Sequence, residues 1–291
     1  MILPFVKMQG AGNDFIMVNA MKTPFEATPE VIRRLCDRRF GVGCDQLLVV
    51  EPPRTTEADF RYRIFNCDGG EVEMCGNGAR CFAVFVREEG LTDKTEIVCE
   101  TKRGLIRPRL ESDGRVTVDM GRPVLDPAAC HFDAAGHARR PGPEEALWEV
   151  AVPGGKAWFS IVSMGNPHAV LLVEDVKTAP VEAVGSALQI QPDFAQKVNV
   201  GFLQVLDRGH ARLRVYERGA GETAACGTGA CAAAVAGMRR RLLDEAVEIE
   251  MRGGRLAVRW DGRGSVFLTG PAEIVFRGTV DTEQLKSPQA F

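Results

Sequence analysis

The sequence contains an internal repeat, and this repeat limits the possible fold more than any other feature. Residues 65–79 align with residues 216–230 without a gap, so that Cys75 corresponds to Cys226, 151 positions further along the chain. Both copies carry a Gly-Glu pair followed by Cys-Gly-x-Gly-Ala. Two halves derived from one ancestral pattern explain these matches, so the sequence predicts two similar domains.

The local patterns are also alike in the two copies. Residues 61–65 and 212–216 alternate polar with apolar side chains, which is typical of half-buried strands. A glycine-rich turn follows, and then apolar residues at helical spacing from Ala79 to Val86, with Gly90 where a helix is expected to end. In the second copy, residues 230–238 are small and apolar on nearly every side, which predicts a helix enclosed by protein. Each domain is therefore predicted to be mostly β, built around one central helix.

Length and composition agree with this organisation. At roughly 150 residues per domain, 291 residues correspond to two domains, and we expect residues 1–122 plus 272–291 in the N-terminal half and 123–271 in the C-terminal half. Segment 130–155 has no clear periodicity, and we expect it to be a surface excursion with solvated histidines at His131 and His137.

Composition excludes several classes of protein. Hydrophobic residues make up 45%, charged residues 26% and the net charge is −3, so neither a disordered chain nor a nucleic-acid partner is expected. No apolar run approaches the roughly 18 residues of a membrane span, and the first residues lack a signal-peptide pattern. These features predict a soluble cytoplasmic protein without a membrane partner.

The nine cysteines include no CxxC pair, which argues against a zinc ribbon or a thioredoxin-type site. No metal is therefore expected. The cysteines that lack a glycine-rich context are predicted to be buried small hydrophobes; they are Cys36, Cys81, Cys99, Cys130 and Cys231.

Cys75 and Cys226 differ, because each directly precedes Gly-x-Gly at a predicted helix start. The unpaired N–H groups and the positive end of the dipole favour an anion there, and such a position can lower a thiol pKa into a range of about 3.5–7.5. If the halves pack around a cleft, one sulfur can remove a proton from a carbon while the other returns one to the opposite face. The repeat thus predicts stereoinversion by two thiols.

Five segments in this order resemble the diaminopimelate epimerase family: Gly10–Phe15, Gly41–Gln46, Met74–Cys81, Met164–His168 and Glu217–Gly229. The resemblance spans nearly the whole chain. It implies an α+β fold of two pseudo-symmetric domains, each a mostly antiparallel β-barrel-like sheet around a central helix, with the active site in the inter-domain cleft. It also implies a homodimeric epimerase that needs no cofactor and interconverts LL- and meso-2,6-diaminopimelate, in lysine and peptidoglycan-precursor synthesis.

The resemblance assigns a role to individual residues by motif position. It implies that Cys75 and Cys226 are the two bases, and that His168 and Glu217 modulate thiol ionisation. The residues implied to hold the carboxylate at the reacting carbon are Gly76, Asn77, Gly227 and Thr228. Those implied near its amino group are Asn13, Gln46 and Glu217, and those at the distal amino acid end are Asn66, Asn166, Asn199 and Arg218.

Some positions depart from the family pattern. Cys44 and Cys67 stand beside binding positions where a small residue such as Ala is usual, and Met74 precedes the first reactive cysteine where Gln is more familiar. Extra thiols near a reactive thiolate raise the chance of unintended disulfides, which a thiol count with and without reductant would detect.

Two alternative functions remain open on the sequence alone. A proline racemase or hydroxyproline epimerase shares the two-thiol arrangement but needs no distal pocket, so Arg218, Asn66 and Asn199 distinguish it from the diaminopimelate enzyme. In a metal-binding or thiol redox-sensing protein, the cysteines would instead be ligands or switches. Bound zinc without isotope exchange into any amino acid would favour that class.

Overall fold

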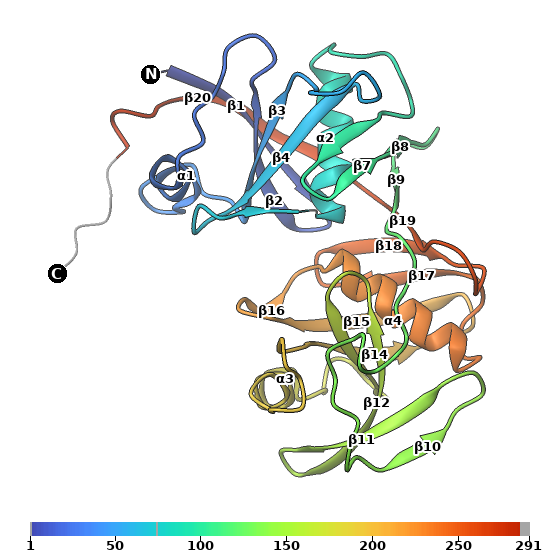
Figure 1. Cartoon of the computed structure of the whole chain (residues 1–291). Coiled ribbons are helices and arrows are strands. Elements are labelled where there is room, and N and C mark those ends of the chain that lie inside the picture. Colours follow the sequence, from blue (N-terminus) through green and yellow to red (C-terminus); the bar gives the residue numbers. More distant parts are fainter. Residues whose placement is uncertain (1, 74, 286–291) are drawn as a thin grey trace, which may run out of the picture. The chain divides into compact units, whose positions relative to one another are not determined.

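The chain divides into two compact units in a computed structural model that describes residues 2–73 and 75–285 (Figure 1). Unit 1 comprises Met1–Val118 and Gly270–Phe291, and unit 2 comprises Asp119–Thr269. Three parts of the sequence-based assignment lie outside the described residues, namely Met1, Met74 and 286–291.

Unit 1 is built on one mixed sheet with the strand order β20-β1-β2-β3-β4-β6-β7, and β5 pairs with β4. Its neighbours are antiparallel except for two parallel pairs, β2 with β3 and β4 with β6. The strands are β1 (Ile2–Gly10), β2 (Asn13–Asn19), β3 (Gln46–Glu51), β4 (Phe60–Asn66), β5 (Glu71–Val72), β6 (Cys99–Thr101), β7 (Gly104–Ile106) and β20 (Glu273–Asp281).

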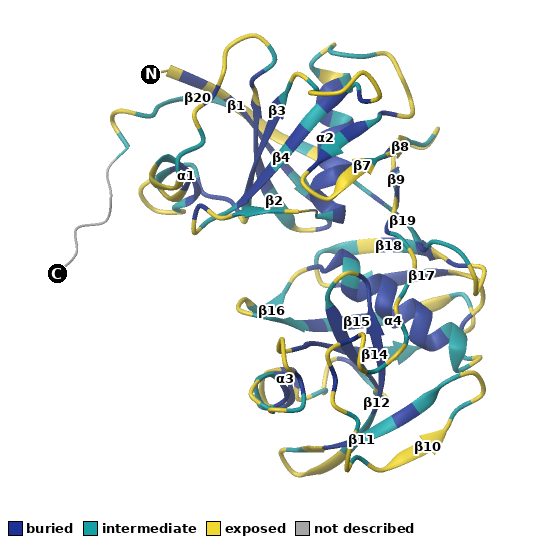
Figure 2. Ribbon diagram, viewed as in Figure 1, coloured by how far each residue is buried: buried dark blue, intermediate teal, exposed yellow. Residues whose placement is uncertain are grey.

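Two helices, α1 (Pro29–Cys36) and α2 (Gly76–Glu88), cover opposite faces of this sheet. Successive side chains of a strand point to opposite faces. On β3, Leu47 therefore packs in the cluster that includes α1, whereas Leu48 faces Gly78 of α2. Tyr62 of β4 also lies on the α2 face. Both faces are buried, and the centre of the sheet is dark blue in Figure 2.

Unit 2 repeats this plan with a longer sheet. Its strand order is β10-β11-β12-β13-β14-β15-β17-β18-β19, and β16 pairs with β15. The strands are β10 (Arg139–Pro141), β11 (Ala146–Val152), β12 (Gly155–Ser163), β13 (Pro167–Leu172), β14 (Asn199–Val205), β15 (His210–Glu217), β16 (Gly221–Thr223), β17 (Ala246–Met251), β18 (Gly254–Arg259) and β19 (Phe267–Gly270). The parallel pairs recur as β13 with β14 and β15 with β17. The short strands β8 (Arg109–Leu110) and β9 (Val116–Asp119) pair with each other, and the boundary between the units falls after Val118.

Helices α3 (Val181–Gln189) and α4 (Gly227–Arg239) again take opposite faces. Neighbouring residues of β15 show this directly, because a Cβ added at Gly185 of α3 would lie 2.4 Å from Tyr216, and one added at Gly229 of α4 would lie 3.0 Å from Val215. These two glycines let the helices approach the sheet closely. As predicted, α4 is enclosed, with residues 230–236 at 0% exposure.

The sequence-based strands at residues 61–65 and 212–216 are confirmed as parts of β4 and β15, and the two helices after the glycine-rich turns are confirmed as α2 and α4. Segment 130–155, expected to be an irregular surface excursion, instead forms strands β10 and β11.

His137 is not solvated as expected. Its ring lies 5.0 Å from that of Phe132, Nδ1 lies 2.8 Å from the Glu149 carbonyl oxygen, and Nε2 lies 3.2 Å from Asp193. The aromatic and polar partners come from residues distant along the chain, which periodicity cannot register. His131 is exposed, as predicted.

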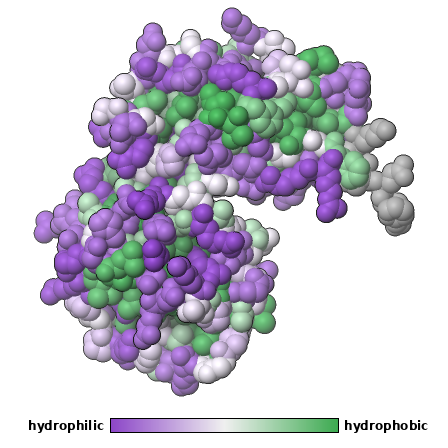
Figure 3. Space-filling view, turned by 180° about the vertical axis from the view of Figure 1, so that it is seen from behind, coloured by the Kyte–Doolittle hydropathy of each residue, from purple (hydrophilic) through white to green (hydrophobic). Residues whose placement is uncertain are grey.

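The face drawn in Figure 3 is largely hydrophilic, with apolar patches in between. On the edge formed by β1 and β20, the exposed large apolar side chains include Ile2, Val275 and Phe276. Among the described residues, no helix combines the length and apolar character that crossing a membrane requires.

Candidate active site

In unit 1, Cys75 is the residue that caps the start of α2. Its extended backbone lets Sγ turn back and accept a hydrogen bond from the Gly78 N–H at 3.4 Å. The first N–H groups of a helix have no partner within it and carry the positive end of its dipole. A sulfur at this position thus shares a patch of donors with any anion that binds beside it.

An asparagine cluster surrounds this sulfur. Asn13 Oδ1 lies 3.8 Å from Cys75 Sγ and accepts from Asn77 Nδ2 at 3.3 Å. Asn13 is itself fixed by its Nδ2 group, which donates to Asp45 at 2.7 Å. The structure therefore brings Asn13 beside Cys75 and Asn77, which belong to a different motif segment.

Gln46 and Asn66 form the adjoining part of unit 1. They are directly paired at the ends of β3 and β4, and Gln46 Nε2 donates to Asn66 Oδ1 at 2.8 Å. Two oxygens here, Gln46 Oε1 and Asn77 Oδ1, are buried without a hydrogen-bond partner in the described structure. Buried polar atoms are nearly always paired in proteins, so these two mark a place where a ligand can supply the missing donors.

In unit 2, Cys226 caps α4 in the same way. Its Sγ accepts from the Gly229 N–H at 3.4 Å and lies 3.5 Å from Thr228 Oγ1. The Cys75 thiol faces an amide oxygen of Asn13 at 3.8 Å, whereas the Cys226 thiol donates to the carboxylate oxygen Glu217 Oε2 at 3.0 Å. The other carboxylate oxygen of Glu217 accepts from Thr223 at 2.5 Å, which fixes the carboxylate toward the sulfur.

The electrostatics of Cys226 run against the expectation from the helix start alone. Burial, followed by the charge and hydrogen bond of Glu217, raises the pKa of the Cys226 thiol well above its ordinary value, although the Thr228 and Gly229 hydrogen bonds act in the opposite direction. The prediction of a lowered pKa is therefore wrong for this cysteine. Cys226 is a neutral thiol near pH 7 that donates a hydrogen bond to the Glu217 carboxylate.

His168 and Asn166 lie at the start of unit 2's strand β13. His168 is buried, and its Nε2 atom lies 3.1 Å from Asn166 Oδ1. Burial and then the positive charge of Arg218 lower the pKa of His168 to about 3, so the imidazole is neutral near pH 7. Its Nδ1 atom has no hydrogen-bond partner in the described part of the chain. His168 is thus a neutral ring that lies close to the positive charge of Arg218.

Asn199 and Arg218 complete this unit's polar cluster. Asn199 Oδ1 accepts from the Arg218 backbone N–H at 2.8 Å, and the guanidinium donates to the Gln196 carbonyl at 2.7 Å. Asn199 Nδ2, like His168 Nδ1, is a buried polar atom without a hydrogen-bond partner in the described structure. Asn199 of β14 is paired in parallel register with His168 of β13, so the two residues are neighbours on adjacent strands.

The two clusters are copies of each other in topology. Gln46 pairs with a residue of β2 in parallel register, and Asn199 pairs with β13 in the same way. The recurring glutamates Glu71 and Glu222 are not part of either cluster. They bind Arg63 and Arg214 through two hydrogen bonds each, at 2.9–3.0 Å and 2.7 Å, and thereby fasten the hairpins that lead to the cysteines.

Two positioning residues were missed by sequence reasoning, namely Asp45 and Thr223. Both lie inside motif segments, but neither carries an assigned role there. Their contribution is to orient Asn13 and Glu217, which only the folded geometry reveals. The available signal was that each is a polar residue inside a motif segment to which no role had been assigned.

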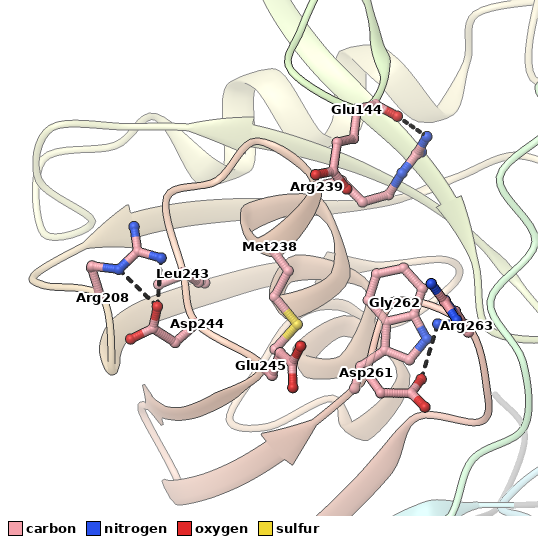
Figure 4. Close-up of a pocket in the computed structure, with 11 residues that line it drawn as sticks. Glu144, Arg208, Met238, Arg239, Leu243, Asp244, Glu245, Asp261, Gly262 and Arg263 are labelled. Carbon is pink, nitrogen blue, oxygen red and sulfur yellow. Dashed lines mark hydrogen bonds and ion pairs between the residues drawn. The ribbon is translucent and has the colours of Figure 1, made fainter.

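A pocket of about 490 Å³ lies elsewhere in unit 2, at the opposite end of α4 (Figure 4). Met238 and Arg239 line it, about 18 Å along the helix from Cys226 at 1.5 Å per residue. Charged residues that line it pair with one another; for example, Arg208 donates to Asp244 at 2.7 Å. Of the described residues lining this pocket, none is a predicted site residue.

Comparison with solved structures reveals relatives of the same fold. A phenazine biosynthesis protein of the PhzF family from Bacillus anthracis superposes with a TM-score of 0.68 at 18% identity, over 96% of this chain and 99% of that one. A hydroxyproline epimerase from Agrobacterium vitis superposes with a TM-score of 0.65 at 16% identity, over 96% and 92%. At such identities these likenesses establish the fold, in line with the predicted α+β class of two pseudo-symmetric halves.

Comparison with curated sequences identifies much nearer relatives. A diaminopimelate epimerase of Azoarcus sp. (strain BH72) is 55% identical over 282 residues, covering 97% of this chain and 99% of that protein. One from Aromatoleum aromaticum is 53% identical over 284 residues, covering 97% and 100%. The family profile described as diaminopimelate epimerase matches residues 5–125 and 160–275. This chain belongs to the diaminopimelate epimerase family.

Proposed function

We propose that this protein interconverts LL- and meso-2,6-diaminopimelate without a cofactor, as a step in lysine and peptidoglycan-precursor synthesis. The observation that carries the proposal is the repeated arrangement of a cysteine at a helix start beside polar side chains. In unit 1 the arrangement has buried unpartnered atoms on Gln46 and Asn77, and in unit 2 on Asn199. The relatives with more than half of their residues in common bear the name of this enzyme.

The proposed reaction uses one cysteine from each unit on the same α-carbon. One sulfur, as thiolate, takes the α-proton, and the electron pair of the C–H bond moves into the adjacent carboxylate to give an enolate-like intermediate. The other sulfur, as thiol, donates its proton to the opposite face. The carbon is inverted, and the two cysteines have exchanged protonation states.

The helix starts are suited to hold the negative charge that develops in this step. Preorganised donors are most effective where charge accumulates in the transition state. We assign the reacting carboxylate to the backbone N–H groups around Gly76, Asn77, Gly227 and Thr228. The reacting amino group is assigned to Asn13, Gln46 and Glu217.

The raised pKa of Cys226 supports a definite resting state. Cys226 begins as the thiol and therefore acts first as the proton donor, with Cys75 as the base. The forward step leaves Cys226 as the thiolate, which is the base of the reverse direction, and the negative charge of Glu217, 3.0 Å from its sulfur, favours the return of the proton to that sulfur. Glu217 thus acts through the thiol, and neutral His168 lies beside Arg218.

The distal amino acid end of the substrate is assigned to Asn66, Asn166, Asn199 and Arg218. An arginine can grip a carboxylate with two parallel hydrogen bonds, and amides can both donate and accept. A proline racemase or hydroxyproline epimerase has no need of such a set, so these four residues favour a substrate with two amino acid heads.

The decisive experiment follows hydrogen exchange at the α-carbon. Incubation of LL-diaminopimelate with the enzyme in heavy water should yield the meso form with one deuterium at the inverted carbon. Cys75→Ser and Cys226→Ser should each slow epimerisation by several orders of magnitude, because serine is a far weaker base at neutral pH.

Cys130→Ser provides the matched control, because Cys130 is a buried cysteine of unit 2 in the apolar cluster with Phe132 and Phe159 and outside both cysteine motifs. It should retain epimerisation. Near-normal turnover in either of the first two variants would contradict the two-thiol mechanism, and inversion of proline in place of diaminopimelate would establish the rival substrate class.

We also propose a cytoplasmic homodimer. The exposed apolar side chains of Ile2, Val275 and Phe276 along the β1 and β20 edge support self-association, because edge strands with exposed apolar residues readily pair. Light scattering of Val275→Lys against the unchanged protein tests the assembly, and an unchanged dimer mass would exclude this edge as the interface.

A further inference from the structure

Three cysteines outside the proposed reaction gather at one point of unit 1. The sulfur atoms of Cys36, Cys44 and Cys67 all lie within 4.8 Å of one another, and those of Cys36 and Cys44 are 3.4 Å apart. Cys36 and Cys44 are 4% and 2% exposed, and Cys67 is half-buried. The group is thus largely enclosed, with one sulfur toward its outer side.

The fold brings these residues together from three separate segments. Cys36 is the last residue of α1, Cys44 precedes β3, and Cys67 follows β4. The backbone N–H of Cys44 donates to the Cys36 carbonyl at 3.3 Å, which holds the first two segments side by side. Cys67 Sγ lies 2.9 Å from the Cys44 carbonyl oxygen, so the third segment is held to the second. Sequence spacing alone does not predict that these three cysteines meet, because they are 8 and 23 positions apart without a CxxC pair.

The donor set selects the chemistry of a ligand. Soft thiolate sulfurs prefer soft metal ions such as Cu(I) or Zn(II) over hard ions such as Mg²⁺ or Ca²⁺. Structural zinc sites are almost always tetrahedral with four protein ligands. Within residues 2–73 and 75–285, no fourth histidine, cysteine or carboxylate atom belongs to this group. Three sulfurs alone suit a three-coordinate monovalent ion.

Charged side chains lie beside these sulfurs and balance one another. Lys7 is buried, donates to the Gly43 carbonyl and pairs with Asp14 at 2.6 Å, and Arg38 pairs with Asp14 at 2.6 Å and with Asp45 at 2.7 Å. Lys7 and Arg38 favour negative charge on the sulfurs, whereas Asp14 opposes it. Three thiolates with one Cu(I) carry a net charge of −2, so the arrangement of the three sulfurs, rather than the surrounding charge, selects the ion.

We propose that Cys36, Cys44 and Cys67 form a binding site for one monovalent soft metal ion, Cu(I), held by three sulfurs. Binding forms three Cu–S bonds and releases to solvent the protons that the sulfurs carried. The ion enters and leaves as Cu(I), so no electron is transferred. A bound ion would tie the end of α1 to the ends of β3 and β4 and thereby stabilise unit 1.

The test removes the reactive thiols that also attract soft metals. In the full-length Cys75→Ala/Cys226→Ala variant, Cu(I) is added anaerobically in competition with a chromophoric Cu(I) chelator. One equivalent should bind, and X-ray absorption should show a first shell of three sulfurs. Adding Cys67→Ser to this background should weaken the affinity by at least about 100-fold, because a direct ligand matters more than the second-shell groups that typically change affinity 10–100-fold.

Cys130→Ser in the same background is the matched control and should leave the affinity unchanged. Circular dichroism confirms folding, and Cu(I) should raise the melting temperature of the background variant but not of the one that lacks Cys67. Equal Cu(I) affinity with and without Cys67 would overturn the proposal. Tight binding of Zn(II) with no Cu(I) bound would overturn the assignment of the ion. Both results are independent of epimerase activity.

Discussion

Glu217 and Cys226 form one acid–base pair, in which the state of the thiol depends on the charge of the carboxylate. The thiol donates to Glu217 at 3.0 Å, and Thr223 keeps the carboxylate in place from its other side. Burial and this negative charge both favour the protonated sulfur. The hydrogen bonds from Thr228 and Gly229 at the helix start lower the pKa, but they do not outweigh burial and the charge of Glu217. The chemistry of this cysteine thus follows from its neighbours more than from its position at a helix.

Replacing the charge tests this account at the level of one residue. Glu217→Gln keeps an acceptor but removes the negative charge, so the pKa of Cys226 should fall. The rate of Cys226 alkylation against pH, followed by mass spectrometry in a Cys75→Ala background, should shift to lower pH accordingly. Glu222→Gln serves as the control, since Glu222 binds Arg214. A midpoint that stays in place in Glu217→Gln would show that burial alone sets the pKa.

His168 should make the stability of unit 2 depend on pH. Its folded-state pKa of about 3 lies below the ordinary value of 6.5, so the unfolded chain binds the proton first. The stabilisation is therefore complete above the unfolded pKa and is lost as the pH falls toward 3. Between pH 7 and pH 5 the loss from this residue should be about 2 kcal/mol.

Urea unfolding followed by tryptophan fluorescence measures this effect, because Trp148, Trp158 and Trp260 all lie in unit 2. His168→Gln should flatten the pH dependence by that amount. His131→Asn, at an exposed position with φ of 59° that Asn tolerates, should leave it unchanged. Equal slopes in His168→Gln and the unchanged protein would mean that the ring binds a proton as readily in the folded protein as in the unfolded chain.

Among the structural elements, the start of α2 shows how closely a helix can approach a sheet. A Cβ added at Gly78 would lie 2.7 Å from Tyr62 Oη, a buried hydroxyl without a hydrogen-bond partner in the described structure. Any side chain at position 78 would therefore collide with one specific atom, Tyr62 Oη. The same turn places the sulfur of Cys75, so packing against the sheet and the geometry of the site are coupled.

A double-mutant cycle tests whether the Tyr62 hydroxyl is what excludes a side chain at position 78. Gly78→Ala should destabilise the protein by about 1–3 kcal/mol through overpacking. Tyr62→Phe should be neutral or slightly stabilising, because it removes an unsatisfied buried hydroxyl. Combining them should recover most of the loss. Far-UV circular dichroism in urea gives the free energies, and strictly additive effects would show that the hydroxyl is not the obstacle.

The sequence predicts these elements unevenly, for physical reasons. Strong alternation and glycine-rich turns identify β4, β15, α2 and α4. Helix α1 had an available signal, since Thr28 caps it and accepts from Val31 N at 3.3 Å, followed by a proline at its start. Helix α3 has no side-chain cap, and strand β10 is exposed along its whole length. In α3, Val181, Val184 and Leu188 recur at helical spacing, a signal that the sequence analysis did not use, whereas β10 has only three residues and is too short and exposed to carry a pattern.

For the molecule as a whole, the repeat predicts that one substrate engages both halves. LL-diaminopimelate should therefore slow the alkylation of both Cys75 and Cys226, although they belong to different units. Mass spectrometry of each cysteine peptide, with and without substrate, measures the protection. L-lysine, which lacks one carboxylate, should protect less. Protection of only one cysteine would mean that the substrate does not bind to both clusters at once.

The sequence could predict the duplicated architecture and the motif residues of both clusters, because these depend on patterns that recur along the chain. It could not predict the contacts of Glu217 with Cys226 or of Asn13 with Asp45, which join residues 9 and 32 positions apart. Nor could it predict the three-cysteine group. Such contacts depend on strand register and helix placement, which individual residues do not encode.

The pairing of β20 with β1 determines the order in which the protein can be completed during synthesis. Strand β20 (Glu273–Asp281) is the last element of the chain, yet it runs antiparallel to β1 at the edge of the first sheet. The ribosome releases every strand of unit 2 before it releases β20. During synthesis, the side of β1 that pairs with β20 therefore stays unpaired until all of unit 2 has left the ribosome.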